Sequence, residues 1–322
     1  ELEGPTPQIV ALVRSPERVQ QVFGDMPENP KVNIDFVECD LTNAKSVQQA
    51  LQGMDAAIWC ATGFSSEQSN TNWIDKAKTL LGIATKRTID ALALPLIAQA
   101  LDTPNGDSTL PRVVMCSSAG VTRPAWDEAK QAQFPGAADI PIVRLNPFGI
   151  LDIKRASEET LRASGVPYCI VRPCGLNNDW PIGSRPILSQ GDVAVGRIHR
   201  KDVAALLVDV LTEPDATGKT FEVIGLCNYP KGTTADPTNG ESAITSALKR
   251  LQSDQDGEIP LAQVAATYAT MQQLLPGETQ NSAALAMGQT YEQLDKGETG
   301  RLGERGSEQV ESAGLQPTTP TS

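Results

Sequence analysis

Short apolar stretches alternate with amphipathic stretches along the first two thirds of the chain. The apolar stretches are rich in Val, Ile, Ala and Cys, which is typical of buried strands, whereas the intervening segments carry apolar residues at helical spacing. The predicted strands span residues 8–14, 33–41, 55–63, 112–121, 166–176 and 219–225. The predicted helices span residues 15–23, 44–52, 74–94, 150–165 and 200–213. Strands separated by helices indicate a parallel sheet covered on both faces, the doubly wound α/β class.

The character of the sequence changes near residue 227. Residues 228–239 are rich in turn-forming residues, and short helices are predicted beyond them at 240–253, 260–275 and 282–294. The final stretch, from residue 297 onward, is polar and typical of disorder. We therefore expect an α/β domain over residues 1–227 and a helical, partly disordered extension over residues 228–322.

The predicted helix over residues 260–275 has one apolar face. Its members, at helical spacing, are Leu261, Val264, Ala265, Tyr268, Met271 and Leu275. Such a face either packs against the main domain, which is the simpler interpretation, or serves as a docking surface for a partner.

Composition and charge exclude several classes of function. A net charge of −12 argues against a broad contact with DNA or RNA, which needs a positive field. No run approaches the ~18 apolar residues that a membrane span needs. The six cysteines form no CxxC pair, so we expect core thiols rather than zinc or redox chemistry. His199 is the only histidine, which excludes a histidine-rich metal site; we interpret it as a cap or loop residue, with a proton-relay role as the alternative.

Four predicted strand ends carry residues suited to a nucleotide, because a ligand of an open parallel sheet lies across the carboxyl ends of the strands. Arg14 ends the first of these strands, and a guanidinium there favours a 2′-phosphate over a pair of ribose hydroxyls. Asp40 ends the second and is able to accept a hydrogen bond from an adenine amino group. The simpler interpretations are a solvated arginine and an aspartate that caps a turn or helix.

The remaining strand ends carry small residues and hydroxyls. They are Ala61, Thr62 and Gly63 in the third strand and Ser117 and Ser118 in the fourth, with Pro173 and Gly175 of the next strand on the far side. Small residues let a nucleotide approach the backbone closely, whereas strand-end hydroxyls also satisfy local backbone groups. Any one of these ends is weak evidence, but four of them in chain order are much stronger.

These stretches resemble the atypical, NmrA-like or Tic62-like branch of the short-chain dehydrogenase/reductase superfamily, which contains NAD(P)-binding Rossmann proteins of plastids and cyanobacteria. The matching segments are VALVRSPERV, FVECDLTN, AAIWCATG, VVMCSSAGV, NPFGILDIKRASEETLRASGVPYCIVRPCGL and RIHRKDVAALLVDVL. They cover about residues 8–225, and the block from Leu151 to Leu176 is the most diagnostic.

The resemblance implies a role for each matching position. The implied cofactor contacts are Arg14, Ser15, Asp40, Leu41, Ala61, Thr62, Gly63, Ser117, Lys154, Pro173 and Gly175. Ser118 matches the catalytic serine, and Lys154 matches the lysine of the YxxxK pattern. Ile150 stands at the tyrosine position, so the usual proton donor is missing, and the position of Tyr168 does not allow it to substitute. Lys154 is otherwise interpreted as a surface lysine.

The resemblance also bears on the N-terminus of the sequence. In the family an arginine-tipped strand comes second, after a strand and a GxxGxxG turn whose backbone N–H groups bind the pyrophosphate. Here ELEGPTPQ resembles the end of the first helix, so no such turn precedes Arg14. We expect that the sequence begins inside a longer protein, with natural loss of the turn as the alternative.

Two main functions follow from the resemblance. The first is an NADP-dependent oxidoreductase acting on an unidentified small molecule, with NADP preferred because of Arg14. The second is a non-catalytic Rossmann scaffold or assembly subunit of a larger, possibly photosynthetic, complex docked through residues 228–322. RNA handling is disfavoured by the acidic balance. The implied location is the chloroplast, in the stroma or at the thylakoid surface, with the cytoplasm as the alternative.

Overall fold

The computed structural model describes residues 8–17, 19, 33–61, 89–101, 109–146, 149–226 and 242–274. The strands are β1 (Gln8–Val13), β2 (Asn33–Glu38), β3 (Ala57–Trp59), β4 (Val113–Cys116), β5 (Tyr168–Pro173), β6 (Gly175–Leu176), β7 (Arg185–Ser189), β8 (Arg197–Ile198) and β9 (Lys219–Leu226). The main sheet has the order β3-β4-β5-β9-β7, in which all pairs are parallel except β7 with β9. The doubly wound α/β class is confirmed, with an antiparallel edge strand added.

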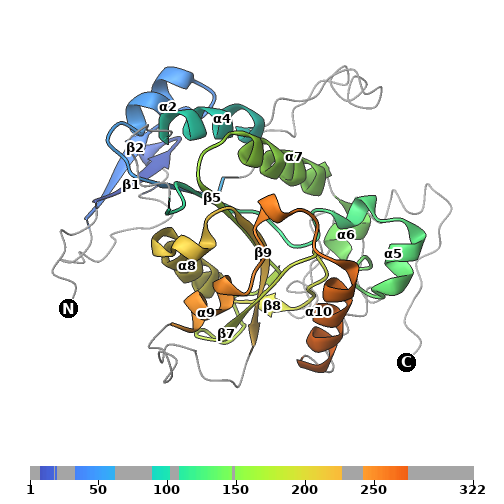
Figure 1. Ribbon diagram of the computed structural model, residues 1–322. Helices are drawn as coiled ribbons and strands as arrows, with labels where there is room; N and C mark the ends of the chain where they lie inside the picture. The colour runs from blue at the N-terminus through green and yellow to red at the C-terminus, as the bar shows by residue number, and fades with distance from the viewer. Residues whose placement is uncertain are drawn as a thin grey trace, which may run out of the picture.

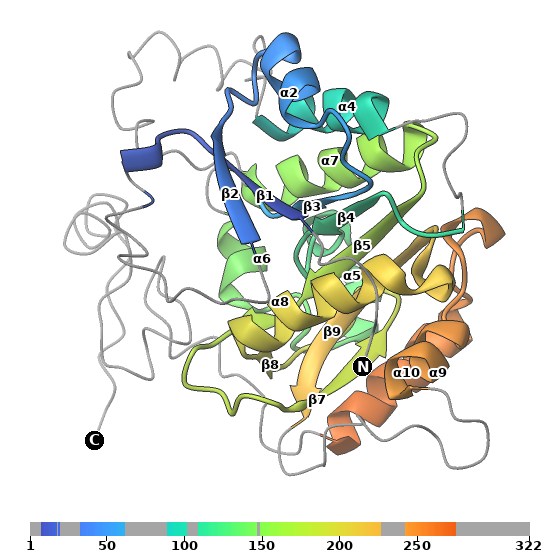
Figure 2. The same ribbon diagram turned by 90° about the vertical axis from the view of Figure 1, so that its left-hand side faces the viewer.

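Strands β1 and β2 form a separate parallel pair beside this sheet. Among the described residues, no ladder joins β1 to β3, although Figure 2 shows the order β2, β1, β3, β4 and β5 across the molecule. In the doubly wound order 3-2-1-4-5-6, a first strand lies between the second and the fourth. The arrangement of β1 and β3 therefore matches the family's second and fourth strands.

Three helices cover one face of the sheet: α2 (Ala44–Ala50), α4 (Ile89–Leu101) and α7 (Ile150–Ala163) (Figures 1 and 2). Side chains alternate along a strand, so Trp59, Met115 and Ile170 share this face and are buried with residues of the three helices. Helix α7 ends as predicted, before Gly165, whose φ of 79° only glycine adopts readily.

Helix α4 corrects the predicted helix over residues 74–94. Its described part runs to Leu101, through Pro95, and residues 74–88 lie outside the described residues. Proline removes a backbone donor in mid-helix, which normally ends or kinks the helix. Here Leu94, Ile97 and Leu101 are all buried against the sheet on one side of the helix, and this burial favours its continuation.

The opposite face is covered by α8 (Arg200–Asp209) and α9 (Ala243–Lys249) (Figures 1 and 2). Val114, Val171 and Phe221 from the strands meet Leu206 of α8 and Leu248 of α9 there, and all five are buried. Helix α9 lies beyond residue 227, so the described start of the extension contributes to the core of the α/β domain. The boundary at residue 227 stays a prediction.

Helix α10 (Leu261–Leu274) packs near the end of α5 (Glu128–Gln133) (Figure 1), and the short helix α6 spans Pro141–Leu145. Val264 and Met271 are buried, and the Tyr268 hydroxyl donates to the Pro135 carbonyl at 2.6 Å. The packing interpretation of this helix is confirmed for these residues. Leu261 is 54% exposed, so it does not belong to the packed face, and Leu275 lies outside the described residues.

Candidate functional site

The carboxyl ends of β3, β4 and β5 meet at one edge of the sheet, where Lys154 of α7 also lies. The Lys154 ammonium donates to the carbonyl of Cys116, the last residue of β4, at 3.3 Å. Lys154 is only partly buried, so its charge is accessible from this edge. The structure therefore brings the predicted lysine to the predicted strand ends.

Ile150, at the tyrosine position of the family pattern, is a core residue. Ile150 is 5% exposed and is buried with Val121, Val143 and Leu151. The Tyr168 hydroxyl donates instead to Asp254 at 2.9 Å, in another part of the molecule. Neither position supplies a phenol near Lys154.

The two serines after β4 have different surroundings. Ser117 is buried, and its hydroxyl donates to Glu158 at 2.6 Å, so the hydroxyl faces the interior rather than the open edge. Ser118 is partly buried and donates to the adjacent Ala119 carbonyl at 3.0 Å. The Ser118 hydroxyl thus satisfies local backbone, the simpler of the two sequence interpretations, whereas the Ser117 hydroxyl binds a side chain of α7.

Pro173 and Gly175 support neighbouring backbone at the end of β5. The Pro173 carbonyl accepts from the Ala119 N–H at 3.0 Å, which joins the β4 and β5 ends. Gly175 donates to the Gly196 carbonyl at 2.9 Å, and a Cβ at Gly175 would lie 3.1 Å from that oxygen. Close pairing of β6 with β8 therefore accounts for this glycine.

Arg14 and Ser15 follow β1. Arg14 is exposed, and its guanidinium makes no ion pair with any residue in the described part of the chain. Ser15 donates to the Glu17 carboxylate at 2.5 Å, and this bond lowers the pKa of Glu17. A positive charge thus lies at the carboxyl end of β1, without a carboxylate partner among the described residues.

Asp40 forms a turn. Its carboxylate accepts from the Thr42 hydroxyl at 2.7 Å and from the Thr42 N–H at 2.9 Å, and these bonds lower the pKa of Asp40. The turn interpretation is therefore the one that the contacts support, and an adenine contact stays a prediction. Leu41 and Ala61 both pack against the buried cluster that contains Met115, so the ends of β2 and β3 share one edge. Thr62 and Gly63 lie outside the described residues.

A pair of thiols lies at this edge, and the expectation of core cysteines is wrong for one of them. Cys60 follows β3 and is exposed, whereas Cys116 is partly buried. A hydrogen bond from the Cys116 thiol, together with the charge of Lys154, lowers the pKa of Cys60 to about 7. Partial desolvation of the thiol by its neighbours acts in the opposite direction. The same hydrogen bond raises the pKa of Cys116. The sequence does not show which residues of β3 and β4 lie opposite each other, so it did not reveal this pair.

A buried charged network extends inward from Ser117. Its members are Arg123, Glu158, Arg172, Asp192 and Glu222. Arg172 binds Glu158 through two hydrogen bonds of 2.9 and 2.6 Å, and Arg123 lies 3.5 Å from Asp192. The sequence signal for this network is a charged residue inside each of two apolar strands, Arg172 in YCIVRP and Glu222 in KTFEVIGL.

His199 has a structural role. His199 is buried and caps α8, its Nδ1 accepting from the Lys201 N–H at 2.9 Å, so the cap interpretation is confirmed. Within the ranges that the structure describes, no group of His, Cys, Asp and Glu is suited to hold a metal ion. In the same ranges, no helix has the length and apolar character of a membrane span.

Comparison with known proteins identifies the fold's family. The model of the NAD(P)H-binding family matches residues 3–214, more than half of the chain. The chain belongs to this family. Its resemblance to the Tic62-like branch is also confirmed, since chloroplast TIC 62 proteins are among its relatives.

Individual relatives of this NAD(P)H-binding protein are distant. An uncharacterised chloroplast protein of Arabidopsis thaliana is 26% identical over 225 residues, 69% of this chain and 70% of that protein. TIC 62 of Pisum sativum, a chloroplast protein, is 28% identical over 222 residues, 66% of this chain but only 34% of TIC 62. A putative NAD-dependent epimerase/dehydratase from Bacillus halodurans has a TM-score of 0.47 and 21% identity, covering 76% of this chain and 88% of that one.

The described residues fit two parts of a nicotinamide dinucleotide. Arg14 suits the phosphate on the adenosine side, and Lys154 suits the hydroxyls of the nicotinamide ribose. Residues 1–13 contain no GxxGxxG spacing. The GxxGxxG spacing occurs at Gly297–Gly306, in a polar stretch with no strand pattern before it and outside the described residues, so it lacks the strand-turn-helix context of such a turn.

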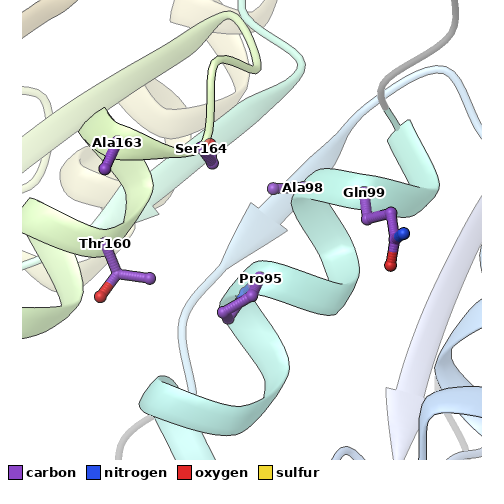
Figure 3. Close-up of a pocket in the computed structure, with 6 residues that line it drawn as sticks. All are labelled: Pro95, Ala98, Gln99, Thr160, Ala163 and Ser164. Carbon is purple, nitrogen blue, oxygen red and sulfur yellow. The ribbon is translucent and has the colours of Figure 1, made fainter.

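A surface cavity of about 440 Å³ lies away from the strand ends beside Lys154. Figure 3 shows that its lining comes from α4, from α7 and from the residue that follows α7: Pro95, Ala98, Gln99, Thr160, Ala163 and Ser164. Ser164 follows α7 and precedes β5, so the cavity lies toward the amino ends of the strands. It is therefore separate from the edge that carries Lys154 and the thiols.

Proposed function

We propose that the protein binds NADP(H) along the carboxyl edge of its strands and acts as an NADP-dependent oxidoreductase on a small molecule. The observation that carries the proposal is the pair of cations on this edge, Arg14 after β1 and Lys154 beside β4. The family match supports dinucleotide binding, and the exposed guanidinium supports the choice of NADP over NAD.

Each side chain has a limited task in this proposal. The nicotinamide, when bound, supplies or accepts the hydride. Lys154 holds the nicotinamide ribose through ammonium hydrogen bonds, and the Cys116 carbonyl positions that ammonium. Arg14 binds the 2′-phosphate. Because Ile150 replaces the phenol, the reaction does not use the tyrosine proton donor of the superfamily.

Replacing Arg14 with alanine tests the cofactor proposal. Charge-assisted hydrogen bonds contribute about 1.5–3 kcal/mol, so we expect NADPH affinity to fall roughly 10- to 100-fold in R14A. NADH lacks the phosphate, and its affinity is expected to change by less than about twofold. Calorimetric titration of both nucleotides measures the difference, with any residues that naturally precede Glu1 retained.

The exposed Arg250, after α9, provides the control for charge. R250A removes one positive charge away from the strand ends and is expected to leave the NADPH to NADH preference unchanged. Equal losses for both nucleotides in R14A, or no nucleotide binding by the unmutated protein, would contradict the proposal.

The second candidate function is a non-catalytic scaffold or assembly subunit in the plastid, docked through the C-terminal extension. Ile150 favours it, because the core isoleucine removes the usual proton donor, and the chloroplast relatives support the location. Its partner is a protein complex rather than nucleic acid, given the charge of −12.

Removal of residues 275–322 tests the scaffold. Deletion from residue 228 is unsuitable, because it also removes buried Leu248 and the Asp254 carboxylate that binds Arg162. The shorter deletion is expected to leave the melting temperature unchanged and to abolish co-sedimentation with a larger assembly. If the truncated protein sediments with the same assembly as the whole chain, docking through this segment is wrong.

A further inference from the structure

Cys60 and Cys116 occupy opposite positions on neighbouring parallel strands. The register pairs Trp59 with Met115, and continuing it by one residue beyond the end of β3 places Cys60 opposite Cys116. Residues opposite each other in parallel strands point to the same face, and their strands lie about 4.8 Å apart. A disulfide requires Cα atoms about 4.4–6.8 Å apart, and the usual strand spacing lies within this range.

The surroundings of the two thiols differ in a way that suits stepwise oxidation. Cys60 is exposed and accepts the hydrogen bond of the Cys116 thiol, while Lys154 supplies the nearby positive charge. These contacts favour the thiolate of Cys60 and the protonated thiol of Cys116. An accessible thiolate beside a second thiol is the arrangement found in reactive thiol pairs.

The other described cysteines lack these features. Cys39, Cys169 and Cys174 are all buried. Burial raises the pKa of Cys169, and the Cys174 thiol donates to the Ala194 carbonyl at 3.4 Å. We therefore expect these thiols to react slowly with oxidants in the folded protein.

We propose that Cys60 and Cys116 form a redox-active pair that a small-molecule disulfide converts into an intramolecular disulfide bond. In the first step the Cys60 thiolate attacks one sulfur of the oxidant, whose S–S bond breaks and releases one thiolate. In the second step Cys116 loses its proton and attacks the sulfur of Cys60, which releases the second thiolate. Two protein thiols are oxidised to one disulfide, and the small disulfide is reduced to two thiols.

This pair lies at the edge that carries Lys154, but the inference does not depend on nucleotide binding. It rests on the strand register, the exposure of Cys60 and the thiol contact. Oxidation therefore tests it separately from the proposed function.

Oxidised glutathione is the probe for the experiment. The whole protein is incubated with it at pH 7.5, free thiols are alkylated, and intact mass and peptide mapping follow. We expect a loss of two hydrogen atoms and a peptide that links Cys60 to Cys116. A stable glutathione adduct at Cys60, a link to another cysteine, or no reaction would each overturn the proposal.

Two variants separate the steps. C116A has no resolving thiol and is expected to retain glutathione on Cys60, whereas C174A, which removes a buried thiol, is expected to form the disulfide as the unmutated protein does. The pH profile of Cys60 alkylation gives an independent check. Its midpoint is expected near pH 7 in the unmutated protein and to move upward in C116A, with alkylation about tenfold slower at pH 7. An unchanged midpoint in C116A would contradict the pairing.

Discussion

Replacing Arg172 with methionine is expected to lower the free energy of unfolding by about 3–5 kcal/mol. The guanidinium makes two hydrogen bonds with Glu158, whose side chain is 0% exposed, and it also lies 3.8 Å from Glu222. Methionine retains the apolar part of the side chain but leaves Glu158 without its main cation. Arg162, 3.0 Å from Glu158 on the solvent side, compensates only in part.

Urea denaturation at pH 7 measures this loss in R172M. The matched control is R155M, because Arg155 pairs with Glu159 on the exposed side of the same helix as Glu158. Exposed pairs of this kind contribute about 0.3–0.5 kcal/mol, so the control is expected to change stability little. The double variant E158M/R172M replaces both charges with apolar groups and is expected to recover most of the loss. Equal stability of R172M and R155M would show that the network does not stabilise the fold.

The sequence predicted the parts of the fold that depend on local pattern. The apolar run around Ile170 and the amphipathic helix before it are found where they were expected, since burial on both sides of the sheet requires those residues. The strand β7 was missed because RPILS is short and has a proline as its second residue. It also pairs antiparallel with a strand that follows it in sequence. Its place depends on a tertiary contact that no local pattern contains.

The candidate site also has features that the sequence predicted and features that it did not. The meeting of the strand ends was predictable because parallel strands bring their carboxyl ends to one edge, whereas the place of Lys154 beside β4 was expected only from the family resemblance. The direction of a side chain at a strand end was not predictable: Ser117 faces inward to Glu158, and Asp40 binds its own turn. The Cys60–Cys116 pair needed the register of two strands, which only the structure supplies.

Glu222 provides a second test of the buried network, because both arginines of the network lie closer to other carboxylates. Arg172 is paired with Glu158 and Arg123 with Asp192, so these four charges balance without Glu222. One of its oxygens has no hydrogen-bond partner among the described residues, and the other accepts from Ser189 at 3.1 Å. Burial, followed by the nearby charge of Asp192, raises the pKa of Glu222 to about 7.

Because this pKa lies above the ordinary value of 4.5, the folded protein binds a proton here that the unfolded chain has already lost between pH 4.5 and 7. The stabilising contribution is therefore complete below pH 4.5 and is lost as the pH rises through 7. At about 1.4 kcal/mol for each pH unit between the two pKa values, the free energy of unfolding is expected to fall by about 3 kcal/mol.

The variant E222Q keeps an uncharged group at this position at every pH. Its unfolding free energy minus that of the unmutated protein, measured in urea from pH 5 to pH 8.5, is expected to rise by about 2–3 kcal/mol between pH 5 and pH 7 and to level off above pH 7. Taking the difference removes the contributions of groups that titrate in both proteins, including Cys60. Glu38 is exposed, so E38Q changes the net charge equally and should give a flat difference. A flat difference for E222Q as well would mean that Glu222 is ionised at low pH, and the network would then carry one more buried anion than its two arginines neutralise.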